Sequence, residues 1–245
     1  MTAPLLQLSQ VRKRFGGIEA LRGVDVDVAH GTLVALIGPN GAGKTTLFEV
    51  ITGFVRPSGG RVRFEDTDIT GLPPHTIAAL GIGRTFQIAR LFPGLSVLDN
   101  VLVGVTFGRS RRLGVRERRL RSERLLEIVG LRDKAAARAR ELSLGEQKRL
   151  ELACALAPEP RLLLLDELTS GLPPRGREEV IRFYGRLRQR GLTIFAIEHS
   201  FRVLTELADQ VVVLEQGEVI ARGAPGTVLG SPRVAEAYWG EEEPS

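Results

Sequence analysis

The strongest restriction on the fold of this chain comes from eight residues, Gly38-Pro-Asn-Gly-Ala-Gly-Lys-Thr45, which match G-x-x-x-x-G-K-[ST] at every fixed position. The apolar stretch 32–37 precedes them and predicts a buried strand, and helix-forming residues follow. Glycines let the backbone curl so that successive N–H groups point inward, and a helix beginning near Gly43 adds its positive end. The sequence therefore predicts a phosphate-binding loop between a buried strand and a helix.

Two side chains of this loop carry specific roles. Lys44 is expected to reach the β- and γ-phosphates of a nucleotide, and the Thr45 hydroxyl to ligate Mg²⁺. The alternative is a glycine-rich turn with a chance lysine, which the strand before and the helix after disfavour. The residues expected to contact ATP here are Gly38, Pro39, Asn40, Gly41, Ala42, Gly43, Lys44, Thr45 and Thr46.

A second apolar stretch, 161–165, ends in the acidic pair Asp166-Glu167. Open α/β sheets present ligand-binding groups at the carboxyl ends of their strands. Asp166 suits Mg²⁺, directly or through water, and Glu167 suits a general base that activates water. An acidic pair after a hydrophobic strand is common and often only structural, but together with the phosphate loop it predicts nucleotide hydrolysis.

Apolar patterning along the chain alternates between strands and helices. Valines and aspartates alternate from Val24 to Val28, which favours an antiparallel strand with one buried and one solvent-exposed face. Expected strands are 5–11, 24–28, 32–37, 61–64, 161–165, 193–197, 211–214 and 218–221; expected helices include 96–103, 117–129, one opened by Pro173-Pro174 and closed by Gly191, and a terminal one ending near 238–239. This pattern predicts an α/β P-loop NTPase core with a mostly parallel central sheet, an antiparallel β subdomain and an inserted α-helical subdomain.

Composition excludes several classes of protein. The chain of 245 residues is 43% hydrophobic and 26% charged, which is typical of a globular protein. A single cysteine, Cys154, rules out an intramolecular disulfide. The first residues lack the pattern of a secretory signal, and no apolar run approaches the roughly 20 residues of a spanning helix. We therefore expect a cytoplasmic location, with any membrane association indirect.

The net charge of +5 is concentrated in one segment, 109–124, which holds eight arginines and two glutamates. Without that segment the chain is close to neutral, which argues against a nucleic-acid-binding face spread over the fold. The segment either faces anionic lipid head groups or an acidic loop of a partner, or forms a solvated helix face. The sequence leaves these alternatives open.

The chain resembles the nucleotide-binding subunits of ATP-binding cassette (ABC) transporters. Besides the phosphate loop and the acidic pair, the resemblance is carried by Gln87 in Arg84-Thr-Phe-Gln87, by Leu142-Ser-Leu-Gly-Glu-Gln147 and by His199 after strand 193–197. It implies that Gln87 lies at the Mg²⁺ and couples the site to a membrane partner. It also implies that Ser143 and Gly145 contact the γ-phosphate bound by the opposite subunit.

The resemblance assigns two further roles, to His199 as a hydrogen-bond partner of the γ-phosphate and to Phe15 as a ring stacked on adenine. Taken alone, Phe15 near a strand end is more often a core residue. Ser143 alone is also an ordinary N-cap, since it precedes an apolar helical run. The catalytic set implied is Lys44, Gln87, Glu167 and His199; the metal set is Thr45, Gln87 and Asp166.

The family implies a single ABC ATPase domain, 1–245, with a catalytic α/β core and β subdomain at 1–87 and 161–245. The helical subdomain with the signature motif would be 88–160. Implied partners are a second ATP-binding subunit, membrane-spanning permease subunits and a separate substrate-binding protein, with no nucleic acid. The chain would then lie peripherally on the cytoplasmic side of the cell membrane.

Within the family, Phe15-Gly-Gly17, the run 83–92, Ile197-Glu-His-Ser200 and the ending Ala237-Tyr-Trp-Gly240 look like importers of branched-chain amino acids. A urea or short-amide importer is an alternative reading. So is a soluble ABC ATPase that acts on ribosomes or nucleic acid, although such proteins usually carry two cassettes or a long coiled-coil insertion. A small-molecule kinase would leave the signature segment unexplained.

Two residues depart from the family pattern. Leu168 stands where proline commonly follows the acidic pair, and Pro173 stands where an aspartate or asparagine is usual. A proline at that place removes a side-chain acceptor and a backbone donor from a loop that usually crosses the dimer interface. The departure at Pro173 therefore bears on coupling between the two sites.

Overall fold

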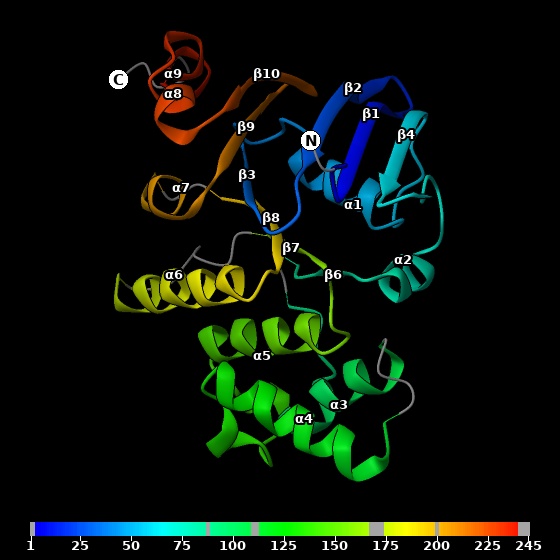
Figure 1. Cartoon of the computed structure of the whole chain (residues 1–245), viewed down its shortest axis with the longest axis vertical. Helices are drawn as coiled ribbons and strands as arrows, with labels where there is room; N and C mark the ends of the chain where they lie inside the picture. The colour runs from blue at the N-terminus through cyan, green and yellow to red at the C-terminus, as the bar shows by residue number, and fades with distance from the viewer. Residues whose placement is uncertain (1–2, 87–88, 109–112, 167–173, 199–200, 240–245) are drawn as a thin grey trace. The chain divides into compact units, whose positions relative to one another are not determined.

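The computed structural model describes residues 3–86, 89–108, 113–166, 174–198 and 201–239 of the chain. It divides into two compact units, of which the first comprises residues 1–74 with 169–245 and the second residues 75–168. Each unit is described separately below. The elements of both are labelled in Figure 1.

The first unit contains an antiparallel sheet with strand order β2-β1-β4-β5. These strands are β1 (Leu6–Phe15), β2 (Ile18–Val28), β4 (Gly59–Phe64) and β5 (Thr67–Asp68). In β2, the valines at 24, 26 and 28 are buried while Asp25 and Asp27 are exposed. The alternation in the sequence thus predicted the one-sided antiparallel strand correctly, although β2 begins earlier than expected.

Parallel strands form the centre of the first unit. β3 (Leu33–Ile37) lies between β8 (Thr193–Ile197) and β9 (Gln210–Glu215) and is parallel to both, while β10 (Glu218–Gly223) is antiparallel to β9. Every residue of β3 and β8 is buried. Uninterrupted apolar strands of this kind require cover on both faces of the sheet.

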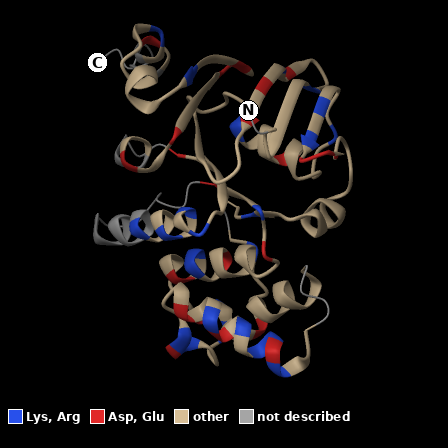
Figure 2. Cartoon of the chain, viewed as in Figure 1, with Lys and Arg blue, Asp and Glu red and all other residues tan. Residues whose placement is uncertain are grey.

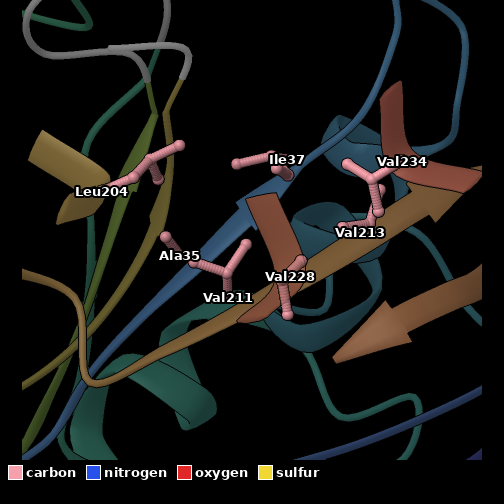
Figure 3. Close-up of a cluster of buried hydrophobic side chains, with 7 residues drawn as sticks. All are labelled: Ala35, Ile37, Leu204, Val211, Val213, Val228 and Val234. Atoms are coloured by element: carbon pink, nitrogen blue, oxygen red, sulfur yellow. The ribbon is translucent and has the colours of Figure 1, made fainter. Parts of the chain in front are cut away.

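Helices supply that cover from two sides. On one face, Ala35 and Ile37 of β3 and Val211 and Val213 of β9 pack with residues of the C-terminal helices in one buried cluster (Figure 3). The helical members of this cluster are Leu204 of α7 (Phe201–Leu207), Val228 of α8 (Pro225–Leu229) and Val234 of α9 (Pro232–Trp239).

The opposite face is covered by α1 (Lys44–Ile51). Phe48 of α1 contacts Phe195 of β8, with 5.2 Å between ring centroids. Phe195 pairs with Val34, whereas Ala35 and Ile37 belong to the other face, since side chains alternate along a strand. Burial on both faces therefore fixes the strand from which the phosphate loop emerges.

The unit also contains α6 (Pro174–Gln189), which begins at the expected proline and is followed by Gly191 at φ 81°.

The second unit is mainly helical and holds one parallel strand pair, β6 (Ile82–Arg84) with β7 (Leu162–Asp166). Its helices α3 (Val97–Phe107), α4 (Val115–Ile128) and α5 (Leu144–Leu156) pack on one another. Shorter elements are α2 (Pro74–Leu80), which begins at the boundary, and the 3₁₀ turns 132–134 and 139–141. The α/β fold class with helical insertion is confirmed; α2, β6, α7 and α8 were not expected from the sequence.

Part of the basic segment forms α4, where blue and red residues are interleaved (Figure 2). Arg119 pairs with Glu123 at 3.0 Å, and Arg121 pairs with Glu159. Ser122 of this helix is buried, as is Leu126. One side of α4 thus belongs to the interior, and some of its arginines are bound by carboxylates of the same unit. Residues 109–112 lie outside the described residues. Throughout the described ranges, no helix is long and apolar enough to cross a bilayer.

Candidate functional site

The phosphate loop has the conformation that its glycines predict. Gly38, Gly41 and Gly43 have φ angles of 153°, 82° and 100°, which side chains other than glycine rarely adopt. Gly43 caps α1, whose first turn has no acidic residue and no side-chain capping bond. Because glycine at the N-cap position has no side chain to occupy this end of the helix, the N-terminus of α1 suits an anion.

Lys44 lies inside the loop rather than in solvent. Its Nζ donates to the carbonyl oxygens of Gly38 at 2.6 Å and Pro39 at 2.8 Å, and the residue is only 7% exposed. These bonds hold the ammonium across the mouth of the loop. The next residue, Thr45, is exposed. A positive charge and a hydroxyl thus stand together at the N-terminus of one helix, which suits the phosphates and the Mg²⁺ of a bound nucleotide.

Two segments far away in the sequence hold the loop in place. A Cβ added to Gly43 would lie 2.5 Å from the Ala20 carbonyl oxygen of β2, and one added to Gly38 would lie 2.0 Å from that of Leu214 in β9. Gly217, in the turn between β9 and β10, donates its N–H to Ala42 at 3.0 Å. The Gly217 carbonyl accepts from the Arg22 N–H at 2.9 Å. The sequence predicted this turn as a hairpin, but nothing in it indicated contact with the loop.

A substitution of Gly217 should therefore weaken nucleotide binding as well as the fold. Gly217 has φ 82°, and an added Cβ would lie 2.7 Å from the Ala20 carbonyl oxygen, so Gly217→Ala must displace backbone beside the loop. We expect a loss of about 2–3 kcal/mol in unfolding free energy and a several-fold weaker MgATP affinity. Calorimetry and thermal melting measure both quantities.

Gly31 provides the matched control, because its φ is 70° and an added Cβ would meet nothing within 4 Å. Gly31→Ala should cost only the left-handed strain, about 1 kcal/mol, and should leave nucleotide affinity unchanged. Equal losses of affinity in the two variants would contradict a bracing role for the turn.

The second unit contains Asp166, the last residue of β7, in a buried ion pair. Its carboxylate lies 3.6 Å from the Arg84 guanidinium at the end of β6, and both side chains are almost fully buried. The Asp166 N–H donates to the buried Thr85 hydroxyl at 3.1 Å. Sequence reasoning did not identify Arg84 as the partner of Asp166. A buried carboxylate needs such compensation, and the pair fixes its position.

Glu151 of α5 holds the chain on both sides of Gln87. Its Oε1 accepts from the N–H groups of Phe86 at 2.9 Å and Arg90 at 3.3 Å. Burial raises the pKa of Glu151, and the nearby Asp166 charge adds to this effect. The Arg84 and Arg90 guanidinium groups lie over the Phe86 ring, with Cζ 4.7 Å and 4.2 Å from its centroid. The segment that leads to Gln87 is thus tied to α5, the helix that begins at the signature segment.

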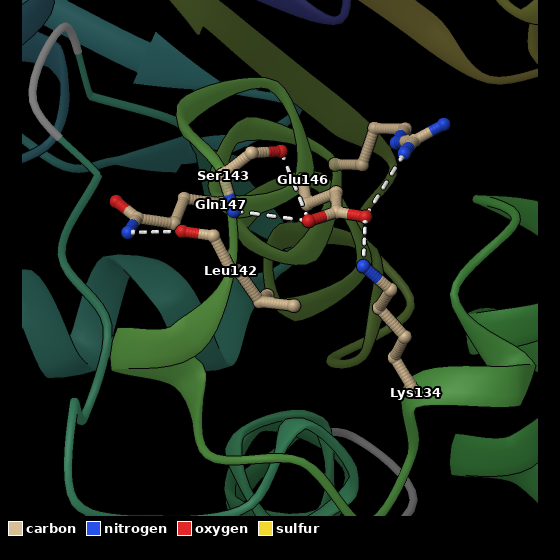
Figure 4. A network of polar contacts seen from close by, with 6 residues as sticks. Lys134, Leu142, Ser143, Glu146 and Gln147 are labelled. Atoms are coloured by element: carbon tan, nitrogen blue, oxygen red, sulfur yellow. Dashed lines mark hydrogen bonds and ion pairs between the residues drawn. The ribbon is translucent and has the colours of Figure 1, made fainter.

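Ser143 is the N-cap of α5, as expected, and belongs to a polar network (Figure 4). Its N–H and its hydroxyl both donate to Glu146 Oε2 at 2.9 Å. Glu146 Oε1 accepts from Lys134 Nζ at 2.5 Å and lies 4.0 Å from Arg149. The Lys134 ammonium and the two bonds from Ser143 lower the pKa of Glu146 from 4.5 to about 2, so this carboxylate is charged at neutral pH.

The signature segment, residues 142–147, is partly open to solvent. Ser143 is exposed and Gly145 partly exposed, so both can be reached from outside the chain. Leu144 between them is 66% exposed. Gln147 Nε2 turns back to the Leu142 carbonyl at 3.0 Å and closes the first turn of the helix.

Phe15 stands at the end of β1 and is 46% exposed, so it is not a core residue. Lys13 Nζ lies over its ring, 4.6 Å from the centroid. The exposed ring is compatible with stacking on a base.

Several residues singled out in the sequence lie outside the described residues, and their assigned roles stay predictions. They are Gln87, Glu167, His199, Leu168 and Pro173. The phosphate loop belongs to the first unit and Asp166, Ser143 and Gly145 to the second, so a shared Mg²⁺ site also stays a prediction.

Comparisons with known proteins agree with these observations. Residues 21–170 match the family described as "ABC transporter". The branched-chain amino acid transport ATP-binding protein BraF of Pseudomonas aeruginosa is 37% identical over 98% of this chain and its own full length. The lipopolysaccharide export system ATP-binding protein LptB of Acidithiobacillus ferridurans is 36% identical, covering 97% of this chain and 98% of LptB.

Among solved structures, the ADP conformation of an ATP-binding cassette of an ABC transporter superposes with a TM-score of 0.84. It is 31% identical, and the match covers 98% of this chain and all of that one. Sequence and fold thus agree over nearly the whole length of the chain. The chain therefore belongs to the ABC transporter family, as an ATPase subunit similar to those of branched-chain amino-acid transport.

Proposed function

We propose that this chain powers a membrane importer of branched-chain or other amino acids by hydrolysing MgATP at sites shared between two ATP-binding subunits. The observation that carries this proposal is the Lys44 ammonium held inside a glycine loop at a helix N-terminus whose cap residue is glycine. The similarity to BraF over 98% of the chain supports the substrate class.

In the proposed site, the loop residues 38–46 bind the phosphates of ATP, and Lys44 offsets the charge of the β- and γ-phosphates. Thr45, Gln87 and Asp166 provide the oxygen ligands that Mg²⁺ prefers, directly or through water. Phe15 stacks on the adenine ring. The Arg84 guanidinium, 3.6 Å from the carboxylate, keeps Asp166 in one place.

Hydrolysis needs a base and a second phosphate clamp. Glu167, directly after Asp166, takes a proton from the attacking water, and His199 hydrogen-bonds the γ-phosphate. Ser143 and Gly145 contact the γ-phosphate bound by the opposite subunit, for which their exposure at the N-terminus of α5 is suited. ATP thus bridges two subunits until it is cleaved.

The chain would act on the cytoplasmic side of the cell membrane, attached through permease subunits and served by a separate substrate-binding protein. The Gln87 segment is the proposed contact for coupling, because Glu151 ties both of its flanks to α5. A movement of α5, which begins at the signature segment, would then also move the Gln87 segment, the proposed contact with the permease.

A second candidate is export, because the lipopolysaccharide export system ATP-binding protein LptB is nearly as similar to this chain as BraF is. Affinity purification of the tagged chain from its own membranes, followed by mass spectrometry, tests the proposal. Permeases with an amino-acid-binding protein encoded beside them are the expected partners. Recovery of exporter subunits would support the second candidate, and recovery of ribosomes would contradict both.

A further inference from the structure

The phosphate contact proposed for Ser143 has an unfavourable neighbour. Glu146 Oε2 accepts a hydrogen bond from the Ser143 hydroxyl at 2.9 Å, so this donor already has an anionic partner. A phosphate oxygen bonded to the same hydroxyl at about 2.7 Å would lie within about 6 Å of the carboxylate. At that separation an unbalanced like charge should weaken phosphate binding by tenfold or more.

Lys134 removes most of this difficulty. Its Nζ lies 2.5 Å from Glu146 Oε1, on the carboxylate oxygen that does not contact Ser143 (Figure 4). Arg149, at 4.0 Å, is the more distant cation. The Glu146 side chain is only 16% exposed, so solvent screens its charge less than that of a surface carboxylate.

We propose that Lys134 is a positioning residue for the γ-phosphate contact of Ser143, because it neutralises Glu146 and lets the N-terminus of α5 accept the phosphate of the opposite subunit. The inference rests on the proposed function, in which Ser143 reaches across a dimer. The Lys134 ammonium makes Glu146 a weaker hydrogen-bond acceptor, so the Ser143 hydroxyl can donate to the phosphate instead of to Glu146. Glu146 still accepts from the Ser143 N–H, and this bond preserves the first turn of α5.

The test uses the full chain with Glu167→Gln, which should retain ATP, and measures the dimer dissociation constant in MgATP by sedimentation. Lys134→Met should raise this constant about tenfold or more, while MgADP affinity of the monomer should not change. Glu146→Gln keeps an acceptor for the Ser143 N–H and removes the charge, so it should dimerise at least as tightly as the parent. Adding it to Lys134→Met should restore dimerisation, and Lys134→Arg should retain it.

The matched control is Arg132→Met in the same 3₁₀ turn. Arg132 pairs with Glu127 at 3.1 Å, away from the signature segment, and its loss should leave dimerisation unchanged. If the Lys134 pair only stabilised the fold, Glu146→Gln would be as damaging as Lys134→Met, and that result would overturn the inference.

The outcomes separate this inference from the proposed function. A parent variant that stays monomeric in MgATP overturns the contact of Ser143 across a dimer, and the inference with it. A parent that dimerises while Lys134→Met dimerises equally well overturns only the role of Lys134. If Lys134→Met lowers the melting temperature, Glu146→Gln still decides the question. Tight dimerisation of Glu146→Gln supports the inference, and dimerisation as weak as that of Lys134→Met indicates a purely structural ion pair.

Discussion

A Glu167→Gln variant should bind MgATP, fail to cleave it, and elute as a dimer in MgATP but as a monomer in MgADP. Glutamine keeps the size and hydrogen bonding of Glu167 while removing the basic carboxylate, so water attack should stop. Uncleaved ATP would then be held by the loop of one subunit and by Ser143 of the other. We expect turnover to fall by at least about a hundredfold, measured by phosphate release, with dimerisation measured by size-exclusion chromatography.

Ser143→Arg provides the control for this result. Placed in the Glu167→Gln background, it adds bulk at the exposed start of α5 and should abolish the dimer without affecting MgADP binding. Retained ATPase activity in Glu167→Gln would remove the base assignment. Inactivity without dimerisation would leave the base assignment in place and would contradict the contact of Ser143 across a dimer of this chain.

The second large effect is expected for Lys44→Ala, which should abolish productive binding of ATP. The substitution removes the buried ammonium that bonds the Gly38 and Pro39 carbonyls and that offsets the phosphate charge. We expect MgATP affinity to fall by at least about a hundredfold, or roughly 3 kcal/mol, measured by calorimetry.

Glu49→Ala in the same helix is the matched control, since it replaces a charged side chain at the sixth residue of α1, beyond the first turn. It should leave affinity unchanged, because alanine is a good helix former and the loop is not altered. Unchanged MgATP affinity and turnover in Lys44→Ala would contradict the assignment of the loop.

Much of the fold could be predicted because its signals are local. The apolar stretches at 32–37 and 193–197 became β3 and β8, as expected of strands covered on both faces. The alternation in 24–28 became half of an antiparallel strand. Short elements such as β6 and α8 were missed, because three to five residues carry too little periodicity to distinguish a strand or helix from a turn.

The candidate site divides in the same way. The phosphate loop, the acidic pair and the signature segment are contiguous motifs, so the sequence by itself predicted a phosphate-binding loop and determined where the strands before it and before the acidic pair would end. Ser143 was predicted as a cap from its place before an apolar helical run, and the structure confirms this.

Only the tertiary structure decided which residues hold those motifs in place. Ala20 and Gly217 brace the phosphate loop, Arg84 compensates Asp166, and Lys134 compensates Glu146. Each of these contacts joins residues from different elements, and neither partner carries a local pattern that marks the other. The physical reason is that a backbone hydrogen bond or a buried charge can be satisfied by any donor that folding brings near it, so the choice of partner is a property of the packed chain.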